Sequence, residues 1–225
     1  MRIPITKYGL PQVVIYPGLC LLLMLLSILT AFFSIGLFLF LELILALILG
    51  WMLSFFRDPL RMVPIGDDLI LSPADGTITD VEVVDEQMFI DGPAIRIGIF
   101  LSVFNVHLNR TPCPIKIENI TYKQGGFINA MDANCGKINE SNNLGMVRLT
   151  EPKEKILVRQ ISGAIARRIV CDAKEGQEFT GGTIFGMIKF GSRTELYLPA
   201  QSTAKILVKK GDKVKAGLTL LAKYE

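Results

Sequence analysis

Apolar and polar residues are distributed differently in two parts of this chain. From Val13 to Phe56, 44 successive residues contain one charged side chain, Glu42, and this is typical of membrane-spanning helices rather than of a surface helix. After Phe56 the pattern changes to short runs in which apolar and polar residues alternate, as in half-buried β-strands. The sequence therefore predicts an N-terminal membrane segment followed by a β-rich domain.

The membrane segment is long enough for two crossings. As a single helix its 44 residues would extend about 66 Å, roughly twice the 30 Å thickness of the hydrocarbon core. Small and hydroxyl side chains gather at 30–36, so we expect a transmembrane helical hairpin with spans near 13–33 and 36–56. Because the turn is itself apolar, a re-entrant hairpin that does not fully cross the bilayer is the alternative.

Basic side chains flank the hairpin at its outer ends and are absent from its turn. Arg2 and Lys7 precede it, and Arg57 and Arg61 follow it. Since cytoplasmic segments carry the excess of Lys and Arg, we expect both ends, and the domain that follows, on the cytoplasmic side of the inner membrane. A cleaved signal peptide would have an apolar core of only about 7 to 15 residues. Glu42 is either a functional ionisable group or a residue that pairs with the neighbouring helix.

We divide the chain into a membrane-anchoring hairpin, 1–56, and one compact domain, 57–225, which is expected to be mainly β (α+β) with antiparallel strands. Alternation is seen at 77–83, 95–99 and 115–118, and turn-forming residues separate the runs at 75–76, 91–93, 111–114 and 125–126. The formal net charge of the whole chain is only +3, so no nucleic-acid partner is expected.

A short motif recurs near the C-terminus after 35 residues: Lys174-Glu175-Gly176 and Gly182 match Lys209-Lys210-Gly211 and Gly217. These turns resemble the hammerhead strands of biotinyl and lipoyl carrier domains, in which glycine permits a positive φ at each bend. No lysine lies where a carrier presents its modified lysine. The repeat is therefore expected to be architectural, in a hammerhead or barrel-sandwich-like C-terminal part, with two merely similar β-turns as the alternative.

Residues 129–145 form a polar stretch too long for an ordinary connection, and we expect either a functional loop or a solvated insert. The chain has a single histidine, and no CxxC pair occurs among its cysteines, Cys20, Cys113, Cys135 and Cys171. This spacing predicts neither a disulfide framework nor a metal site, and it indicates a reducing compartment.

Three short blocks carry reactive side chains: a carboxylate at Asp75, an imidazole at His107 and a hydroxyl at Ser192. Taken alone, each has a structural explanation as a turn aspartate, a buried histidine or a bulge in a strand. Together they supply the groups that activate a weak nucleophile. Two reactions fit: hydrolysis of an external acyl group, or attack by Ser192 on its own preceding peptide bond at Gly191. The glycine favours the second, since without a Cβ it lets the hydroxyl approach the carbonyl.

Five motifs follow one another between residues 55 and 193. They are Phe55-Phe56-Arg57-Asp58-Pro59, Ser72-Pro73-Ala74-Asp75-Gly76, Asn105-Val106-His107-Leu108-Asn109-Arg110, Asn139-Glu140 and Phe190-Gly191-Ser192-Arg193. One of them alone would carry little weight. In this order they resemble the successive motifs of the short-form phosphatidylserine decarboxylases of bacteria.

The resemblance implies a self-processing carboxy-lyase that converts phosphatidylserine to phosphatidylethanolamine and CO2. By similarity, Ser192 attacks the Gly191 carbonyl, and an acyl shift and β-elimination leave a β chain of residues 1–191 and an α chain of residues 192–225. The α chain then begins with a pyruvoyl group made from Ser192, whose ketone forms a Schiff base with the substrate amine. Neither pyridoxal phosphate nor a metal is expected. His107 and Asp75 match the family's proton-transfer positions, with the division of roles between them left open.

The resemblance also bears on the substrate and on assembly. It implies a membrane phospholipid as substrate, met at the bilayer surface by an anchored enzyme, and a homodimer of the two-chain protein. Arg110, Arg193 and the polar loop 129–145 are candidate headgroup contacts, with solvated surface as the alternative. Some longer family members carry a second histidine at the position of Phe104, so a water molecule or another group would have to replace it here if it is needed.

Three alternatives stay open at this point. Archaetidylserine or a related aminophospholipid has the same headgroup chemistry as phosphatidylserine. A membrane-anchored serine hydrolase would use Ser192, His107 and Asp75 as a triad. A non-enzymatic carrier or membrane scaffold would use only the hammerhead-like domain.

Overall fold

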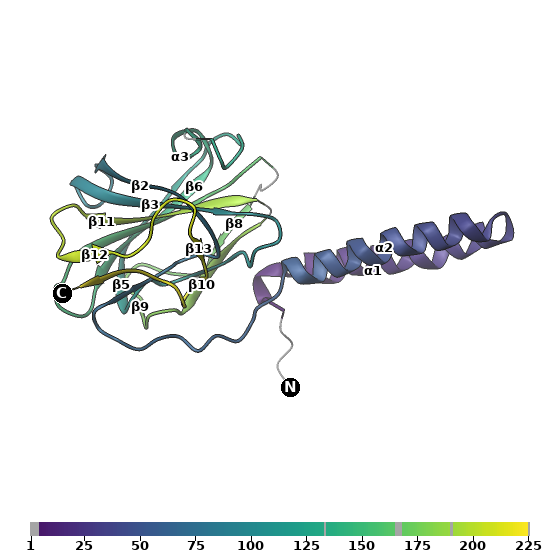
Figure 1. The fold of residues 1–225 in the computed structure, drawn as a ribbon, viewed down its shortest axis with the longest axis horizontal. Helices are drawn as coiled ribbons and strands as arrows, with labels where there is room; N and C mark the ends of the chain where they lie inside the picture. The colour runs from purple at the N-terminus through teal and green to yellow at the C-terminus, as the bar shows by residue number, and fades with distance from the viewer. Residues whose placement is uncertain (1–4, 133, 165–167, 190, 225) are drawn as a thin grey trace. The chain divides into compact units, whose positions relative to one another are not determined.

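The computed structural model describes residues 5–132, 134–164, 168–189 and 191–224. Arg2 beside the hairpin, Ala133 of the polar loop and Phe190 of the fifth motif lie outside the described residues. The chain divides into two compact units, Met1–Leu60 and Arg61–Glu225; the boundary predicted from the sequence lies after residue 56. Figure 1 shows that the first unit is helical and that the second consists mostly of strands.

The first unit is a pair of apolar helices, as predicted. Its elements are a 3-10 turn, η1 (Lys7–Gly9), then α1 (Gln12–Ser27), a 3-10 segment, η2 (Ile28–Phe32), and α2 (Ile35–Phe55). Ser34 caps α2, because its side chain accepts a hydrogen bond from the Leu37 N–H at 3.3 Å. With 21 residues α2 is about 31.5 Å long, so its length matches the hydrocarbon core of a bilayer. Gln12–Phe32 and Ile35–Phe55 are both long and apolar enough to cross a membrane.

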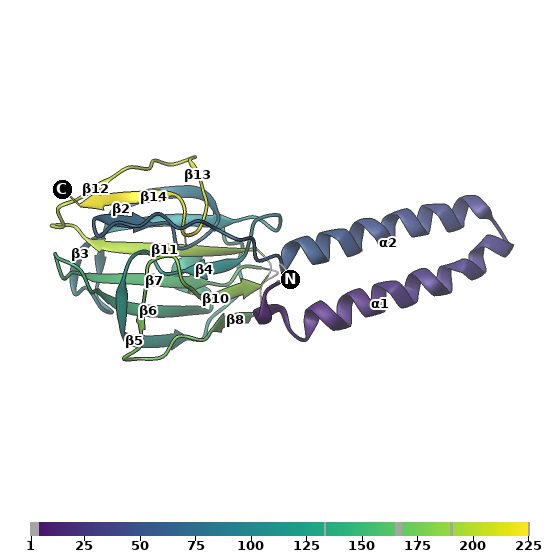
Figure 2. The same ribbon diagram turned by 90° about the horizontal axis from the view of Figure 1, so that it is seen from below.

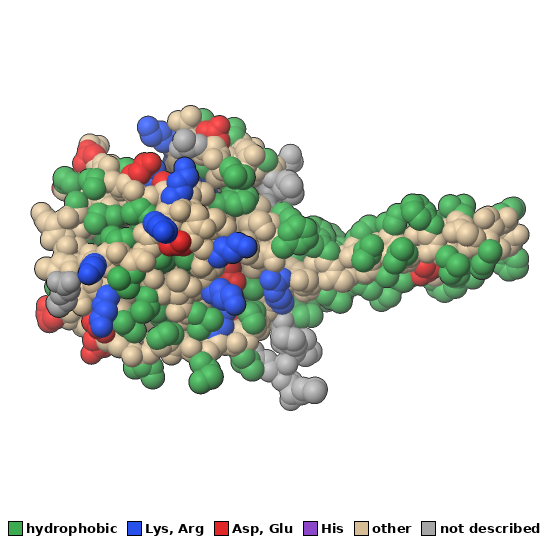
Figure 3. All heavy atoms as spheres, in the orientation of Figure 1, with side chains coloured by type: hydrophobic (Ala, Val, Ile, Leu, Met, Phe, Trp, Pro, Cys, Tyr) green, Lys and Arg blue, Asp and Glu red, His purple; other side chains and the backbone are tan. Residues whose placement is uncertain are grey.

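Two polar contacts join the helices of this pair. Ser27 Oγ donates to Glu42 Oε1 at 2.5 Å, and Cys20 Sγ donates to the Leu45 oxygen at 3.3 Å. Apolar side chains cover most of the remaining surface of the pair (Figure 3). In an apolar environment such interhelical hydrogen bonds stabilise the pairing of helices, and Glu42 therefore pairs with the neighbouring helix.

The second unit is mainly β, as predicted, and its paired strands are antiparallel. Its elements are β1 (Leu69–Leu71), β2 (Gly76–Glu86), β3 (Gly92–Leu101), β4 (Leu108–Arg110), β5 (Ile115–Lys123), α3 (Cys135–Ile138), β6 (Ser141–Arg148), β7 (Lys155–Ile161), β8 (Arg168–Cys171), β9 (Glu178–Phe179), β10 (Ile184–Lys189), β11 (Ser192–Pro199), β12 (Ala204–Ile206), β13 (Lys213–Val214) and β14 (Leu220–Tyr224). The three alternating runs predicted from the sequence lie in β2, β3 and β5.

Within the described residues these strands form one large and two small sheets. The large sheet has the order β13-β2-β3-β11-β7-β6-β5-β9, and the three-stranded sheets have the orders β1-β14-β12 and β4-β10-β8. Figure 2 shows β3, β11, β7 and β6 side by side. The large sheet ends in the short strands β13 and β9, so it does not close into a barrel.

The strand β11 lies near the middle of the large sheet and positions the candidate site. It pairs with β3 along its whole length and with β7 at its other edge. Because side chains alternate along a strand, Ser192, Thr194 and Leu196 share the face that packs on the apolar core. Arg193 and Glu195 lie on the opposite face. The strand therefore presents an apolar face and a charged face on either side of its backbone.

The repeated motif near the C-terminus forms the same turn twice. Four glycines in it have a left-handed φ: Gly176 (81°), Gly182 (74°), Gly211 (96°) and Gly217 (68°). In the first copy the Gly176 N–H donates to the Ile117 oxygen, and in the second the Gly211 N–H donates to the Ile78 oxygen, both at 2.8 Å. The two copies thus lie in the same way against two different strands, β5 and β2, which agrees with an architectural repeat.

Candidate active site

His107 is held by the turn that precedes β4. Asn105 fixes this turn, because its Oδ1 accepts a hydrogen bond from the Ser102 N–H at 2.9 Å. The His107 side chain is fully buried, and its Nδ1 lies 2.9 Å from the Asn105 backbone oxygen. A carbonyl oxygen can only accept, so Nδ1 carries the proton of this bond. In the neutral ring the lone pair is then on Nε2, which makes Nε2 the nitrogen that can take up a proton.

Ser192 begins β11 and is fully buried. Its Oγ has no hydrogen-bond partner among the residues that the structure describes. A buried hydroxyl without a partner costs about 1 to 3 kcal/mol, so such groups are uncommon in purely structural positions. Gly191 before it has a φ of 63°, a conformation in which other residues are strained. The step from Gly191 to Ser192 therefore combines an unpaired nucleophile with a turn suited to glycine.

The Gly191 carbonyl packs closely on Gly163, and Gly191 borders a cavity. A Cβ at Gly163 would collide with the Gly191 carbonyl oxygen. The cavity has a volume of about 300 Å³ and is lined by Phe100, Ser102, Val103, Phe104, Asn129, Ala130, Ala164 and Gly191. Small-molecule sites typically have volumes of about 300 to 1,000 Å³. The predicted scissile bond therefore lies beside a space large enough for a small headgroup.

A larger cavity, of about 560 Å³, lies elsewhere in the domain, lined mainly by residues 63–71, 113–114 and 180–183. Asp75, His107 and Ser192 line neither cavity, but Gly191 lines the smaller one and not the larger. The smaller cavity is the better candidate substrate site, because it borders the peptide bond at which chemistry is expected.

Asp75 lies in a buried ion pair. Its two carboxylate oxygens accept hydrogen bonds from Nη1 and Nη2 of Arg61 at 2.6 and 2.8 Å. The Ala216 N–H also donates to Oδ1 of Asp75 at 2.8 Å. Within the described residues the carboxylate makes its hydrogen bonds with Arg61 and Ala216, so the contiguous triad that a serine hydrolase would need is not seen.

The segments that carry the three predicted groups nevertheless meet. The Pro73 carbonyl accepts a hydrogen bond from the Arg110 N–H at 2.9 Å, which joins the second motif to the third. Asn109 Nδ2 donates to Thr194 Oγ1 at 3.0 Å, which joins the third motif to the strand that begins with Ser192. The contact between Asn109 and Thr194 was not predicted from the sequence. The sequence spacing could have indicated it, since Asn109 lies two residues beyond His107 and Thr194 lies two residues beyond Ser192.

The chain is similar to known proteins over most of its length. A sequence profile of the family described as phosphatidylserine decarboxylase matches residues 48–222. The chain belongs to this family. Relatives named phosphatidylserine decarboxylase proenzyme include one from Carboxydothermus hydrogenoformans, 42% identical over 185 residues (82% of this chain and 85% of the relative), and one from Rhodopirellula baltica, 38% identical over 223 residues (99% and 89%). Another, from Ehrlichia chaffeensis, is 46% identical over 168 residues (75% and 73%). The resemblance drawn from the five motifs is confirmed.

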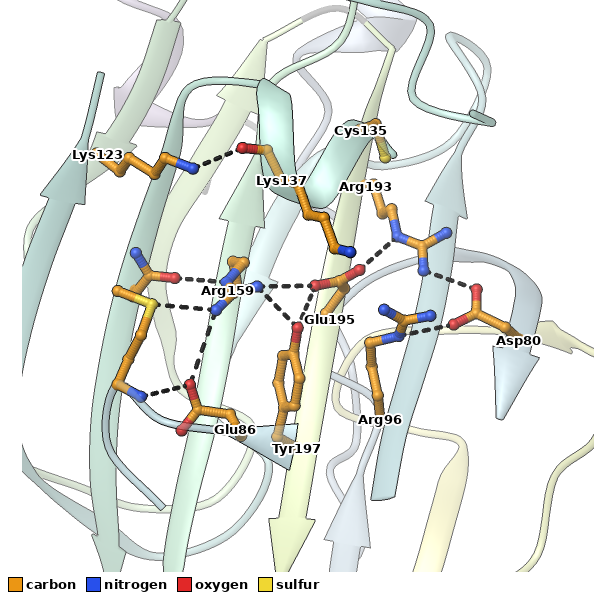
Figure 4. A network of polar contacts seen from close by, with 12 residues as sticks. Asp80, Glu86, Arg96, Lys123, Cys135, Lys137, Arg159, Arg193, Glu195 and Tyr197 are labelled. Atoms are coloured by element: carbon orange, nitrogen blue, oxygen red, sulfur yellow. Dashed lines mark hydrogen bonds and ion pairs between the residues drawn. The ribbon is translucent and has the colours of Figure 1, made fainter. Parts of the chain in front are cut away.

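Two arginines of the phosphatidylserine decarboxylase motifs are bound inside the protein. Arg193 is buried, and its guanidinium nitrogens donate to Glu195 at 2.8 Å and to Asp80 at 2.6 Å (Figure 4). They also donate to the Thr79 hydroxyl at 2.8 Å. Arg110 is also buried, and its Nη1 donates to the Gly182 oxygen at 2.9 Å. Guanidinium groups held in this way stabilise the fold. They do not support the expectation that these two arginines contact a lipid headgroup.

The ion-pair network of Figure 4 fixes the charges on the outer face of β11. Burial opposes ionisation of Asp80, but the Thr79 hydroxyl and the Arg193 guanidinium together outweigh it and hold the pKa of this carboxyl below its usual value. Burial and the Glu195 carboxylate both raise the pKa of Tyr197, whose hydroxyl donates to Glu195 at 2.6 Å. Asp80 and Arg193 therefore stay charged, and Tyr197 stays neutral, around neutral pH.

The polar loop lies against this network and is anchored to the domain. Asn139 of the fourth motif closes it, because its side chain bonds both the N–H and the oxygen of Ile128 at 2.8 Å and the Ser162 oxygen at 2.7 Å. A Cβ at Gly136 in α3 would lie 3.2 Å from Glu195 Oε1. The first residues of the loop line the smaller cavity. These contacts favour a functional loop over a solvated insert.

Phe104 lines the smaller cavity at the position where some longer family members carry a histidine. Its side chain has no group for proton transfer, so His107 is the imidazole available on this segment. In the described parts of the chain, no group of three or more His, Cys, Asp or Glu side chains is arranged to hold a metal ion.

Proposed function

We propose that this chain is a proenzyme that cuts itself between Gly191 and Ser192 and then decarboxylates phosphatidylserine to phosphatidylethanolamine and CO2. The observation that carries the proposal is the buried Ser192 hydroxyl, unpaired among the described residues, next to the glycine turn. Family membership supports the reaction, because the relatives bear the name phosphatidylserine decarboxylase proenzyme.

Self-cleavage requires Ser192 Oγ to attack the Gly191 carbonyl carbon. The peptide C–N bond then breaks, the nitrogen gains the proton that Oγ loses, and an ester links the two segments. Removal of the Cα proton of residue 192 breaks its Cβ–O bond, which frees the Gly191 carboxylate and leaves a dehydroalanine. Hydrolysis of that group by water releases ammonia and yields the pyruvoyl group. We assign proton transfer in these steps to Nε2 of His107.

The pyruvoyl group supplies an electron sink for the carbanion that remains when CO2 leaves. It would lie beside the 300 Å³ cavity, since it is made from the residue that follows Gly191. In this proposal the cavity holds the headgroup, and His107 returns a proton to the substrate carbon. Asp75 is the alternative proton-transfer residue, although its ion pair with Arg61 favours a role in fixing the turn before β2.

The proposal predicts that the purified wild-type protein consists of two chains. By proportion of 24.9 kDa, the α chain of residues 192–225 has a mass of about 3.8 kDa. Its N-terminus should resist Edman degradation and react with carbonyl reagents, because a ketone has replaced the amine. Intact-mass spectrometry and CO2 release from phosphatidylserine in detergent micelles check both steps.

Other results of the same experiment point to the alternatives. A single intact chain that hydrolyses acyl esters would support the serine hydrolase, and an intact chain without activity would support the carrier or scaffold. A two-chain protein that prefers archaetidylserine to phosphatidylserine would change the substrate and leave the mechanism in place.

We further propose that the hairpin crosses the inner membrane twice and leaves the β domain in the cytoplasm. The two spans are each long enough to cross, and Lys7 and Arg57 flank them. A reporter that is active only in the periplasm should be inactive when fused after Arg61 and active when inserted at Ser34. Activity after Arg61 would contradict the orientation, and inactivity at both positions would indicate the re-entrant hairpin.

The homodimer implied by the family resemblance stays a prediction. Analytical ultracentrifugation of the detergent-solubilised, two-chain protein would test it, since the mass of one protein copy is known from the sequence.

A further inference from the structure

A buried hydrogen bond links the segment of His107 to the strand of Ser192. Asn109 Nδ2 donates to Thr194 Oγ1 at 3.0 Å, and both side chains are fully buried. Thr194 lies two residues beyond Ser192 on the same face of β11, and Asn109 lies two residues beyond His107. The hydrogen bond therefore joins two side chains that each lie two residues beyond a candidate reactive residue.

The amide of Asn109 is itself held in one orientation. Gln160 Nε2 donates to Asn109 Oδ1 at 2.9 Å, and Asn142 Nδ2 donates to Gln160 Oε1 at 3.0 Å. Because Oδ1 accepts from Gln160, the Nδ2 group of Asn109 faces Thr194 as the donor. All of these side chains are buried. A buried chain of amides whose members satisfy one another is rigid, so it fixes β4, β7 and β11 relative to each other.

Self-cleavage gives the hydrogen bond between Asn109 and Thr194 a larger share in holding residue 192 in place. Before the cut, residue 192 is held by the backbone on both sides. After the cut it is a chain terminus, and chain termini lose order unless contacts hold them. On the outer face, the ion pair of Arg193 with Asp80 holds β11 to β2. The bond from Thr194 to Asn109 holds the inner face, and it leads to the segment that carries His107.

We propose that Asn109 is a positioning residue that keeps the new N-terminus of the α chain in register with His107 through Thr194. Gln160 sets the orientation of the Asn109 amide. This inference rests on the proposed self-cleavage and decarboxylation. It predicts that losing the hydrogen bond between Asn109 and Thr194 lowers the rate of decarboxylation by the cleaved enzyme more than the rate of self-cleavage.

The test is Thr194→Val, which keeps the shape of the side chain and removes the acceptor. We expect self-cleavage to proceed at nearly the wild-type rate, since the intact backbone holds Ser192. In the mature enzyme, kcat per pyruvoyl group should fall by about 10- to 100-fold, because a misplacement of about 1 Å between reacting groups has an effect of that order. KM should stay close to the wild-type value, because neither Thr194 nor Asn109 lines the cavity.

Three further variants separate positioning from general stability. Thr194→Ser restores the acceptor and should recover most of kcat. Gln160→Leu removes the hydrogen bond that orients the Asn109 amide, so it should also lower kcat. This variant replaces Thr194→Val as the test if Thr194→Val does not fold. Thr111→Val is the matched control: Thr111 is fully buried and its Oγ1 donates to the Thr180 oxygen at 2.6 Å. It should lower Tm and leave kcat unchanged.

The inference is overturned if Thr194→Val has the wild-type kcat. It is also overturned if the rate of self-cleavage and kcat fall by the same factor, because that is the result expected of a protein that is only destabilised. Failure of serine to rescue would also overturn it. The wild-type protein is measured in parallel. If the wild-type protein neither cuts itself nor releases CO2, the proposed function fails, whereas a normal wild type with an unaffected Thr194→Val rejects only the positioning role.

Discussion

Changing Ser192 to alanine should leave one chain of 24.9 kDa that has no decarboxylase activity. The alanine removes the hydroxyl that attacks Gly191 and also the source of the pyruvoyl group. Because the Ser192 hydroxyl has no hydrogen-bond partner among the described residues, its removal breaks no bond there, and the folded state should be retained. Intact-mass spectrometry, a carbonyl-reagent assay and a thermal melt together measure cleavage, pyruvoyl content and stability.

The matched variant is Ser192→Cys, which keeps a nucleophile in the same place. A thiol can perform the acyl shift, so partial cleavage is expected, whereas elimination and pyruvoyl formation need not follow efficiently. The pyruvoyl mechanism would be wrong if Ser192→Ala still released CO2 from phosphatidylserine at a rate near that of the wild type.

Changing His107 to alanine should lower the decarboxylation rate by about 10²- to 10⁴-fold, the usual contribution of a positioned proton-transfer group. The physical reason is the orientation of the ring: Nδ1 donates to the Asn105 oxygen, so the lone pair of the neutral ring is on Nε2, which we propose as the base. The rate should be expressed per pyruvoyl group, so that any loss of self-cleavage is counted separately.

The control is His107→Asn, whose side-chain amide can replace the Nδ1 donor to the Asn105 oxygen and has no group equivalent to a basic Nε2. We expect it to be as inactive as His107→Ala but more stable to heat. A properly cleaved His107→Ala protein with near-normal turnover would give His107 a structural role and make Asp75 the main candidate for proton transfer.

Much of the fold could be predicted because it follows from local patterns. Two-residue alternation placed β2, β3 and β5, and an apolar run twice the thickness of a bilayer predicted the helical hairpin. The repeated glycines near the C-terminus predicted two equivalent turns, since a positive φ is a property of the local backbone. What sequence reasoning could not supply was the order of the strands, which depends on contacts between residues far apart in the chain.

The sequence singled out the candidate reactive residues, whose roles stay predictions, but it did not indicate the ion pairs around them. Arg193 was a candidate headgroup contact, with solvated surface as the alternative, and both interpretations placed its guanidinium at the surface, where arginine is usually found. It is buried because two carboxylates, on Asp80 and Glu195, neutralise it, and Asp80 lies 113 residues earlier in the chain. Asp75 was grouped with the reactive residues, but its place in the fold is set by Arg61, whose role the flanking-charge argument did not indicate.

The position of β11 in the large sheet has a consequence for how the two products of self-cleavage relate. The segment 192–225 contributes β11 between β3 and β7 and also contributes β12, β13 and β14 to the sheets. If the chain cuts itself as proposed, the small product stays in the middle of the larger product's own sheet, and neither piece has a complete core without the other. We therefore expect the mature protein to be a two-chain assembly rather than an enzyme that has lost a peptide.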